Sequence, residues 1–268
     1  MKRAIQLMGI VNLTDDSFYA PSRVRSTEAL LRRVATLLQE GADSVDLGAC
    51  STRPGALPVG EKEEWRRLRP ALKALREAFP ALNLSIDTYW SGVVRRAYDT
   101  IGSFTVNDIS AGAQDPAMLR TVGALGLPYI AMHMRGTPET MQTLTDYPEG
   151  ITAAVLRYFR DFAARAAEAG IQNWIADPGF GFSKTLEQNW TLLRELGALQ
   201  ALGRPILVGV SRKSMIYKRF GLTPETSLEA TQIAHRIALE QGATILRVHD
   251  IAPALATVRQ WQAEEISK

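Results

Sequence analysis

Two hydrophobic patterns alternate along the chain from one end to the other. Short apolar runs, typical of buried strands, are separated by longer stretches in which apolar residues recur at helical spacing. The predicted strands lie near Ile5–Ile10, Ser44–Leu47, Leu84–Ile86, Phe104–Val106, Tyr129–Met132, Trp174–Ala176, Ile206–Val208 and Thr244–Val248. The predicted helices include Thr27–Glu40, Glu61–Phe79, Gly150–Ala169, Leu186–Leu202 and Glu225–Gln241.

This alternation predicts an α/β fold with a closed parallel sheet. The strand–helix unit recurs about eight times in 268 residues, a period of about 33 residues that suits a (β/α)₈ TIM barrel. Several predicted helices end just before a glycine, as at Gly41, Gly170 and Gly242, which is usual where a helix gives way to a strand. A doubly wound open sheet is the structural alternative, because alternation does not prove closure. Without a linker or composition break, residues 1–268 are expected to form one domain.

Polar residues stand at or just after the end of nearly every predicted strand. In a barrel these ends meet on one face, where active sites are built from the loops between strands and helices. One polar strand terminator is unremarkable, but a polar group at almost every strand end predicts a shared site. The residues concerned are Asn12, Asp46, Asp87, Asn107, His133, Asp177, Ser211, Arg247 and His249.

Composition and charge exclude several classes of protein. With 46% hydrophobic and 22% charged residues, the chain resembles ordinary globular domains and not disordered ones. A net charge of +3, without aromatic interleaving of the basic residues, argues against a nucleic-acid partner. A single cysteine, Cys50, excludes a disulfide framework and a cysteine-based zinc finger. The start lacks signal-peptide features and no apolar run reaches about 18 residues, so no membrane span and a cytoplasmic location are expected.

The first two strands run into loops rich in oxygen donors. Asn12 and residues 14–17 are suited to Mg²⁺ or a polar ligand, although a capping loop would have the same composition. The second loop, residues 51–56, combines hydroxyls with Arg53 and is suited to an anion, unless it is an ordinary Pro-Gly turn. Cys50 has no neighbouring base, so inert packing is expected.

The middle strands offer groups for a flat, polar ring. Asp87 and Asn107 supply the acceptors and donors that a heterocycle would match. Met132 supplies an apolar wall beside His133, which by itself is more often structural than catalytic. Asp177 precedes glycines that allow the backbone to approach a ligand closely.

The last two strands offer groups for an anion. Ser211, with Arg212 and Lys213, opens a helix-like segment that would bind a carboxylate or phosphate, unless it is a solvated basic turn. Arg247 and His249 are two residues apart on a strand, so they face the same side and suit a pyrophosphate. The dispersed histidines argue against a zinc site.

Taken in order, these motifs resemble the dihydropteroate synthase family from Met8 to Asp250. The resemblance implies a barrel enzyme that joins p-aminobenzoate to 6-hydroxymethyl-7,8-dihydropterin diphosphate, with Mg²⁺, and releases pyrophosphate. Family members are commonly dimers, so a homodimer is expected. The motifs that carry the resemblance are Asn12 with Asp16-Ser17-Phe18, Ser51–Ala56, Asp87, Asn107-Asp108-Ile109, Asp177–Phe182, Ser211–Ser214 and Arg247–Asp250.

The resemblance also implies a role for each site residue. The pterin would be held by Asp87, Asn107, Asp177 and Lys213, with Met132 in its wall. The diphosphate and metal would be held by Asn12, Arg53, Arg247 and His249, with Asn12 as the metal ligand. The surroundings of p-aminobenzoate would be Thr52, Phe182 and Ser211. The expected catalytic groups are Asp87, Asp177, Lys213, Arg247 and His249.

The expected chemistry is an SN1-like displacement. Cleavage between the pterin methylene and the diphosphate leaves negative charge on pyrophosphate, which Arg53, Arg247, His249 and Mg²⁺ would stabilise. Asp87 and Asp177 would stabilise the positive pterin. The arylamine is already neutral at pH 7, so no strong base is required.

The chain differs from the family pattern at two positions, and two other functions are possible alternatives to this interpretation. The family usually has Pro where this chain has Asp15, and many members have Glu where it has Cys50. One rival is a pterin-binding methyltransferase barrel, as in corrinoid systems, which has no evident use for the Ser211 and Arg247 motifs together. The other is a non-catalytic barrel that binds a pterin or diphosphate, which does not require this many intact catalytic loops.

Overall fold

Strands and helices alternate along the chain in the computed structural model, which describes residues 4–13, 26–50 and 59–266. The strands are β1 (Gln6–Asn12), β2 (Ser44–Gly48), β3 (Leu84–Asp87), β4 (Thr105–Asp108), β5 (Tyr129–Met132), β6 (Trp174–Asp177), β7 (Leu207–Val208) and β8 (Ile245–Val248). The α-helices are α1 (Thr27–Gln39), α2 (Glu61–Ala78), α3 (Ser91–Ile101), α4 (Met118–Leu125), α5 (Ile151–Glu168), α6 (Leu186–Arg194), α7 (Ser214–Arg219), α8 (Leu228–Glu240) and α9 (Ile251–Ile266). The 3₁₀ helices among the described residues are η2 (Met141–Thr143) and η3 (Leu196–Leu202).

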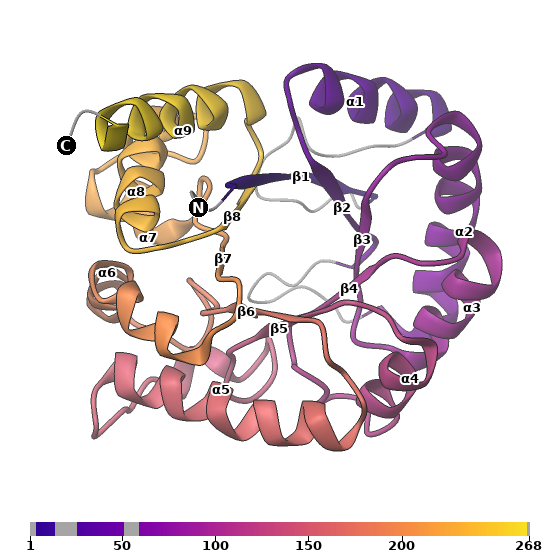
Figure 1. The fold of residues 1–268 in the computed structure, drawn as a ribbon, viewed down its shortest axis with the longest axis horizontal. Helices are drawn as coiled ribbons and strands as arrows, with labels where there is room; N and C mark the ends of the chain where they lie inside the picture. Colours follow the sequence, from indigo (N-terminus) through magenta and orange to yellow (C-terminus); the bar gives the residue numbers. More distant parts are fainter. Residues whose placement is uncertain (1–3, 14–25, 51–58, 267–268) are drawn as a thin grey trace.

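The strands close into a ring that the helices surround (Figure 1). Their order is β6-β5-β4-β3-β2-β1-β8-β7, and the paired strands are parallel. An isolated parallel bridge between Ala176 in β6 and Ile206, just before β7, joins the two ends of this order. The amide of Ala176 donates to the carbonyl of Pro205 at 3.0 Å. The predicted TIM barrel is therefore confirmed, and the open sheet is excluded.

One predicted helix is divided. The apolar spacing over Leu186–Leu202 predicts a single helix, but α6 ends at Arg194 and η3 continues the segment. Gly197 lies in this second part, and glycine weakens an α-helix because it has the most backbone freedom to lose. Helix α6 begins with a complete capping box, in which Thr185 and Gln188 each accept from the other's backbone amide.

Alternation along the strands divides the barrel into an inner and an outer set of side chains. A small apolar cluster inside the ring contains Met8, Ile130, Leu207 and Ile245, with Ile175 against it. On β5, β6 and β8, the residue two positions further along is Met132, Asp177 or Arg247, and it shares the inward face because side chains repeat every second residue. The site side chains therefore form the next layer of the barrel interior, directly beyond this apolar cluster.

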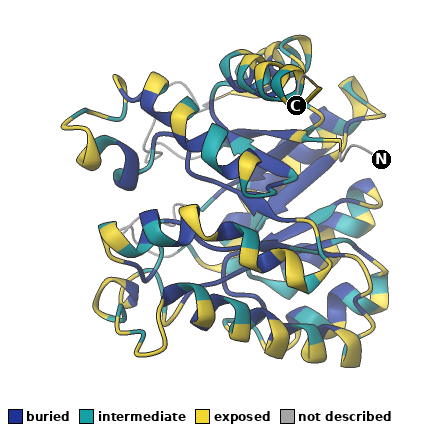
Figure 2. Cartoon of the chain, turned by 60° about the vertical axis from the view of Figure 1, so that its left-hand side comes forward, coloured by how far each residue is buried: buried dark blue, intermediate teal, exposed yellow. Residues whose placement is uncertain are grey.

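The main core lies between the strands and the helices. Its fully buried members include Val45, Ile86, Val106 and Leu246 from the outward faces of the strands. Figure 2 shows the buried positions concentrated on the strands and on the helix faces that cover them, with exposed positions on the outer surface. Among the described helices, none has the length and apolar character required to cross a membrane.

Candidate active site

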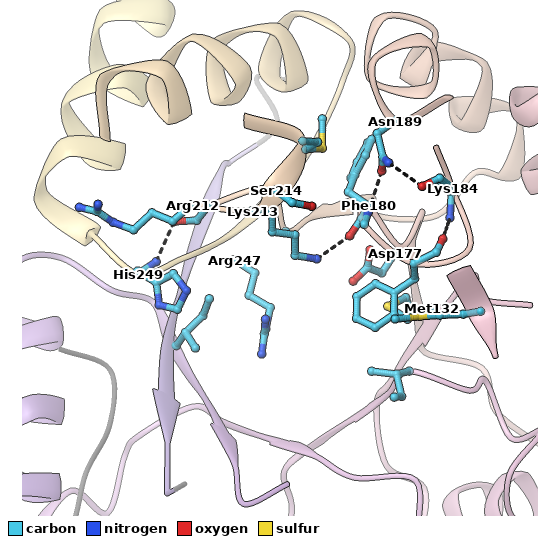
Figure 3. Close-up of a pocket in the computed structure, with 18 of the residues that line it drawn as sticks. Met132, Asp177, Phe180, Lys184, Asn189, Arg212, Lys213, Ser214, Arg247 and His249 are labelled. Carbon is cyan, nitrogen blue, oxygen red and sulfur yellow. Dashed lines mark hydrogen bonds between the residues drawn. The ribbon is translucent and has the colours of Figure 1, made fainter. Parts of the chain in front are cut away.

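A cavity of about 520 Å³ opens at the carboxyl ends of the strands (Figure 3). Of the nine strand-end residues expected to share a site, all but Asp46 and His133 line it, so most of the expected convergence on one face is observed. Thr52 and Arg53, with Asp15 and Asp16, lie outside the described residues. The lining residues foreseen from the sequence are Asn12, Asp87, Asn107, Met132, Asp177, Phe182, Ser211, Lys213, Arg247 and His249.

An ion-pair network joins four strands beneath the cavity. The Nε and Nη2 atoms of Arg247 each lie 2.7 Å from Oδ2 of Asp46. The Nδ2 group of Asn107 donates to the same oxygen at 3.0 Å. The Nη2 atom of Arg247 also lies 3.5 Å from a carboxylate oxygen of Asp87. Asp46 is fully buried and pairs with two nitrogens of Arg247, so it holds the guanidinium over the middle of the barrel.

Asp46 has no assigned role in the sequence interpretation, although it stands among the strand-end polar residues. Its position on the strand does indicate that its side chain faces the inside of the barrel. Asp46 and Gly48 are two residues apart in β2, and Gly48 pairs with Asp87 in β3, so Asp46 and Asp87 belong to inward-facing rows. The partner that gives Asp46 its role, Arg247, is 201 positions away in the sequence.

Two carboxyl groups in the cavity have altered acidity. Burial raises the pKa of Asp87 to about 7; the negative charge of Asp46 adds to this rise, and Arg247 opposes it. Burial also raises the pKa of Asp177, while Lys213 and the backbone amide of Gly179 lower it. That amide donates to Oδ1 of Asp177 at 2.8 Å. Both groups are placed to accept hydrogen bonds from a polar ligand at the bottom of the cavity.

Asn107 and Asp108 occupy opposite sides of β4. Asn107 lines the cavity, whereas Asp108 is buried on the other side. The carboxylate of Asp108 accepts from the hydroxyl of Tyr129 at 2.6 Å and from the amide and hydroxyl of Ser110 at 2.7 Å each. Asp108 therefore fixes the turn after β4. Of these two residues, Asn107 is the one whose side chain faces the cavity.

Lys213 extends across the cavity from the loop after β7 (Figure 3). Its Nζ donates to the carbonyl of Phe180 at 2.7 Å and lies 4.9 Å from the centre of the Phe182 ring. Burial lowers the pKa of Lys213 to about 8; Arg247 adds to this effect, and Asp177 opposes it. A cation is thus held close to the acids of the cavity.

Arg212 does not act as a second free cation at this end of the cavity, contrary to the prediction. Its Nε and Nη2 groups donate to the two oxygens of Asp250 at 2.7 and 3.1 Å. Its Nη1 group donates to the carbonyls of Pro224 and Glu225. The guanidinium is buried and joins the loops after β7 and β8, and so the charge of Arg212 is used within the protein.

Ser211 and His249 are joined through the backbone. The amide of His249 donates to Oγ of Ser211 at 3.2 Å, and the carbonyl of His249 accepts from Arg33 at 2.7 Å. Burial, with positive charges led by Arg247, lowers the pKa of His249 to about 3. In the free protein the imidazole is therefore neutral at pH 7, and it offers a hydrogen bond to an anion instead of a full charge.

An apolar wall completes the cavity. Met132 packs with Ile109, Met134 and Met141, and the rings of Tyr89 and Phe182 lie against this cluster. Polarisable methionine side chains adapt to the face of an aromatic ring. Cys50 also lines the cavity, and burial raises the pKa of its thiol, which agrees with the predicted inert role.

His133 lies behind the wall as a structural histidine. It is buried, packs edge-on against the ring of Tyr158 at 4.8 Å, and places Nδ1 2.9 Å from Nζ of Lys184. The structural interpretation of His133 is confirmed by this packing. Lys184 is a buried lysine to which the sequence assigns no role, although a lysine within a glycine- and phenylalanine-rich loop is an unusual residue to bury.

Asn12, the predicted metal ligand, belongs to the part of the chain that the structure describes. It ends β1, is half-buried, and directs Oδ1 over Gly48. Within the described residues, no group of three or more His, Cys, Asp or Glu side chains is arranged to hold a metal. A single amide oxygen in an open cavity fits Mg²⁺ that takes its other ligands from phosphate oxygens and water.

Comparison with known proteins gives one consistent result. A family model described as "Pterin binding enzyme" matches residues 8–249. The dihydropteroate synthase of Haemophilus influenzae is 38% identical, over 96% of this chain and 93% of its own length. A crystal structure of Yersinia pestis dihydropteroate synthase with a sulfonamide drug complex has a TM-score of 0.92 at 34% identity, covering 99% of this chain and 95% of that one. The Xanthomonas albilineans dihydropteroate synthase with 4-aminobenzoic acid has a TM-score of 0.88 at 37% identity, with coverages of 98% and 93%.

Proposed function

Since the chain belongs to the dihydropteroate synthase family of pterin-binding enzymes, we propose how its cavity joins p-aminobenzoate to 6-hydroxymethyl-7,8-dihydropterin diphosphate. The products are 7,8-dihydropteroate and pyrophosphate. The observation that carries this proposal is the division of the cavity into two ends. Asp87, Asn107 and Asp177 line it from β3, β4 and β6, whereas Lys213, Arg247 and His249 line it from β8 and the loops after β7 and β8, and an apolar wall completes it.

The first of these two sets is assigned to the pterin. Asp87 and Asp177 accept hydrogen bonds from its ring nitrogens and amino group, and Asn107 supplies both a donor and an acceptor. Lys213 reaches the same ring from the loop after β7, and Met132 covers one face of it. Burial of these groups strengthens each contact, because water no longer competes for it.

The diphosphate is assigned to the groups around β1 and β8. Arg247 and His249 contact its oxygens, and Arg53 is proposed to join them. Asp46 holds Arg247 in place, so the guanidinium needs little reorganisation when the anion arrives. Asn12 is proposed as the protein ligand of Mg²⁺, which would neutralise charge on the diphosphate when it is bound.

The second substrate is assigned to the side of Lys213 that faces Phe182. The Phe182 ring offers an apolar surface to the p-aminobenzoate ring. Ser211, with Thr52, is proposed to hold its carboxylate. This arrangement would aim the arylamine at the pterin methylene carbon.

The proposed reaction is an SN1-like displacement. The bond between the methylene carbon and the diphosphate oxygen breaks, and its electron pair leaves with pyrophosphate. The arylamine nitrogen then forms the new bond to carbon and releases a proton to water. Asp87 and Asp177 favour positive charge on the pterin, while Arg247 favours negative charge on the leaving group. Positioning and electrostatic stabilisation thus supply most of the rate, without a strong base.

We further propose that the enzyme is a cytoplasmic homodimer. The resemblance to the family supports the dimeric state. Large apolar side chains exposed near the helices before and after β8 are consistent with a protein interface: Phe220 is 44% exposed, Ile233 53% and Ile266 71%. Light scattering after size-exclusion chromatography tests the dimer, and a monomer at micromolar concentration would contradict it.

The test of the reaction uses the purified protein with Mg²⁺, the pterin diphosphate and p-aminobenzoate. Dihydropteroate, identified by mass spectrometry, should form together with an equal amount of pyrophosphate. Omission of p-aminobenzoate is the control for simple hydrolysis. Tight binding of the pterin diphosphate without product would instead support a non-catalytic barrel. Methyl transfer to a corrinoid would support the rival enzyme.

A further inference from the structure

The loop between β6 and α6, residues 178–185, is held from two sides by lysines. Lys213 approaches from the cavity and binds the carbonyl of Phe180 at 2.7 Å. Lys184, which also borders the cavity, lies on the other side of the loop, and only 4% of the residue is exposed. Its Nζ lies 2.9 Å from the carbonyl of Gly179 and 3.0 Å from that of Phe182. Carbonyls of neighbouring residues in this loop therefore point in opposite directions.

The backbone conformation explains this alternation. Every second residue of the loop has a positive φ: +69° at Gly179, +85° at Gly181 and +46° at Ser183. A left-handed residue between right-handed or extended ones reverses the direction of the peptide group. Ser183 pays a steric cost for this conformation that glycine would not, so contacts elsewhere must maintain it.

The hydroxyl of Tyr147 donates to the Ser183 carbonyl at 2.9 Å, and Lys184 holds the carbonyls of Gly179 and Phe182 before it. The third atom within 3.0 Å of its Nζ is Nδ1 of His133, at 2.9 Å. An ammonium group donates one N–H to each of the two carbonyls and one to Nδ1. A neutral amine donates to the two carbonyls and accepts from Nδ1–H instead. Both protonation states therefore use the same three contacts.

The same contacts join the loop to the barrel. His133 follows β5 directly, and its own carbonyl lies so close to Gly179 that a Cβ there would come within 2.1 Å of it. The Oδ1 atom of Asn189 accepts from the amide of Gly181 at 2.7 Å, which fixes the loop to α6 as well. Figure 3 shows Asn189, Lys184 and Phe180 to the right of Lys213, with Phe180 between the two lysines.

We propose that Lys184 is a positioning residue, which holds the Phe182 carbonyl and thereby keeps the Phe182 ring facing the second substrate. The inference rests on the proposed function, because it assigns Phe182 to p-aminobenzoate. Lys184 acts through the loop and does not touch the reacting atoms. Its removal should therefore weaken p-aminobenzoate binding much more than pterin binding.

The test compares steady-state kinetics and binding in matched variants. Lys184→Met keeps the length of the side chain but removes its polar contacts. The KM for p-aminobenzoate should rise by about tenfold or more, as expected for a displaced binding group. The Kd of the pterin diphosphate, measured by calorimetry without p-aminobenzoate, should change by less than about threefold. Lys73→Met on the exposed outer side of α2 is the control and should leave both constants within about twofold.

A second variant separates positioning from folding. Lys184→Gln retains two N–H donors without the charge, so it should recover part of the p-aminobenzoate KM and carries the test if the methionine variant does not fold. An unchanged p-aminobenzoate KM in a folded variant would overturn the inference. So would an equal rise in both constants, or the failure of both variants to fold, because Lys184 would then support the whole barrel. A wild-type protein that makes no dihydropteroate would refute the proposed function instead.

Discussion

Removal of the Arg247 guanidinium should nearly abolish synthase activity. A preorganised donor aimed at charge that develops in the transition state contributes about 2–4 kcal/mol, which corresponds to a loss of about 30- to 1000-fold in kcat/KM. Arg247 meets this description because two of its nitrogens lie 2.7 Å from Asp46 and only 17% of its side chain is exposed. The guanidinium is thus already oriented and largely shielded from water before a diphosphate arrives.

The single variant Arg247→Ala would change both the catalytic rate and the stability of the fold, so its loss of activity could not be assigned to either one. It would leave the carboxylate of Asp46 fully buried without its cation, and breaking a buried ion pair in this way costs about 3–5 kcal/mol of folding free energy. The double variant Asp46→Asn/Arg247→Met removes both charges together, so it does not leave a charged Asp46 buried without its cation. Asp46→Asn alone is the matched control and should lose less activity, since the guanidinium remains.

The assay measures dihydropteroate formation at saturating p-aminobenzoate over a range of pterin diphosphate concentrations. Thermal unfolding of each variant shows that the comparison is made between folded proteins. A loss smaller than about tenfold in the folded double variant would refute the assignment of Arg247 to transition-state charge.

Three further predictions concern acidity, the loop after β6 and the ion pair near α9. With Asp87 at a pKa of about 7 and Lys213 at about 8, kcat/KM for the pterin diphosphate should fall as pH drops through 7 and protonates the carboxylate, and fall again as pH rises through 8 and deprotonates the amine. A profile that is flat between about pH 6 and about pH 9, a range that includes both pKa values, would contradict these roles. Gly179→Ala should cost more stability than Gly203→Ala, because both have positive φ but only the first places its Cβ against backbone; equal urea midpoints would argue against the close approach. Arg212→Met should destabilise the protein by about 3–5 kcal/mol in urea unfolding, since it leaves its carboxylate partner unpaired, and a cost under about 1 kcal/mol would show that this ion pair is not structural.

The parts of the site that could be predicted from the sequence are those that follow from local pattern. Asp87 and Asp177 end apolar runs, and any parallel barrel brings such ends to one face. The pair Arg247 and His249 was foreseen from spacing alone, because alternation places them on one side of a strand. The structure places all four at the same cavity.

Other assignments depended on contacts between distant segments. Asp46 was identified only as a strand-end residue, since its role comes from a partner 201 positions away. The sequence motif around Arg212 suggested a cation for a ligand, but Asp250, 38 positions later, takes up its charge. Nothing near Lys184 in the sequence indicates its role, because its contact with His133 spans 51 positions.

The sequence by itself determined the repeating strand–helix order, the apolar inner and outer faces of the strands, and the chemical groups at their ends. These follow from periodicity and residue type, which act within a few neighbouring positions. Only the tertiary structure decided that β6 and β7 close the ring, that Arg247 faces Asp46, and that the loop after β6 lies between two lysines. The physical reason is that hydrogen bonds and ion pairs act over about 3 Å, and the register between strands determines which distant side chains come that close.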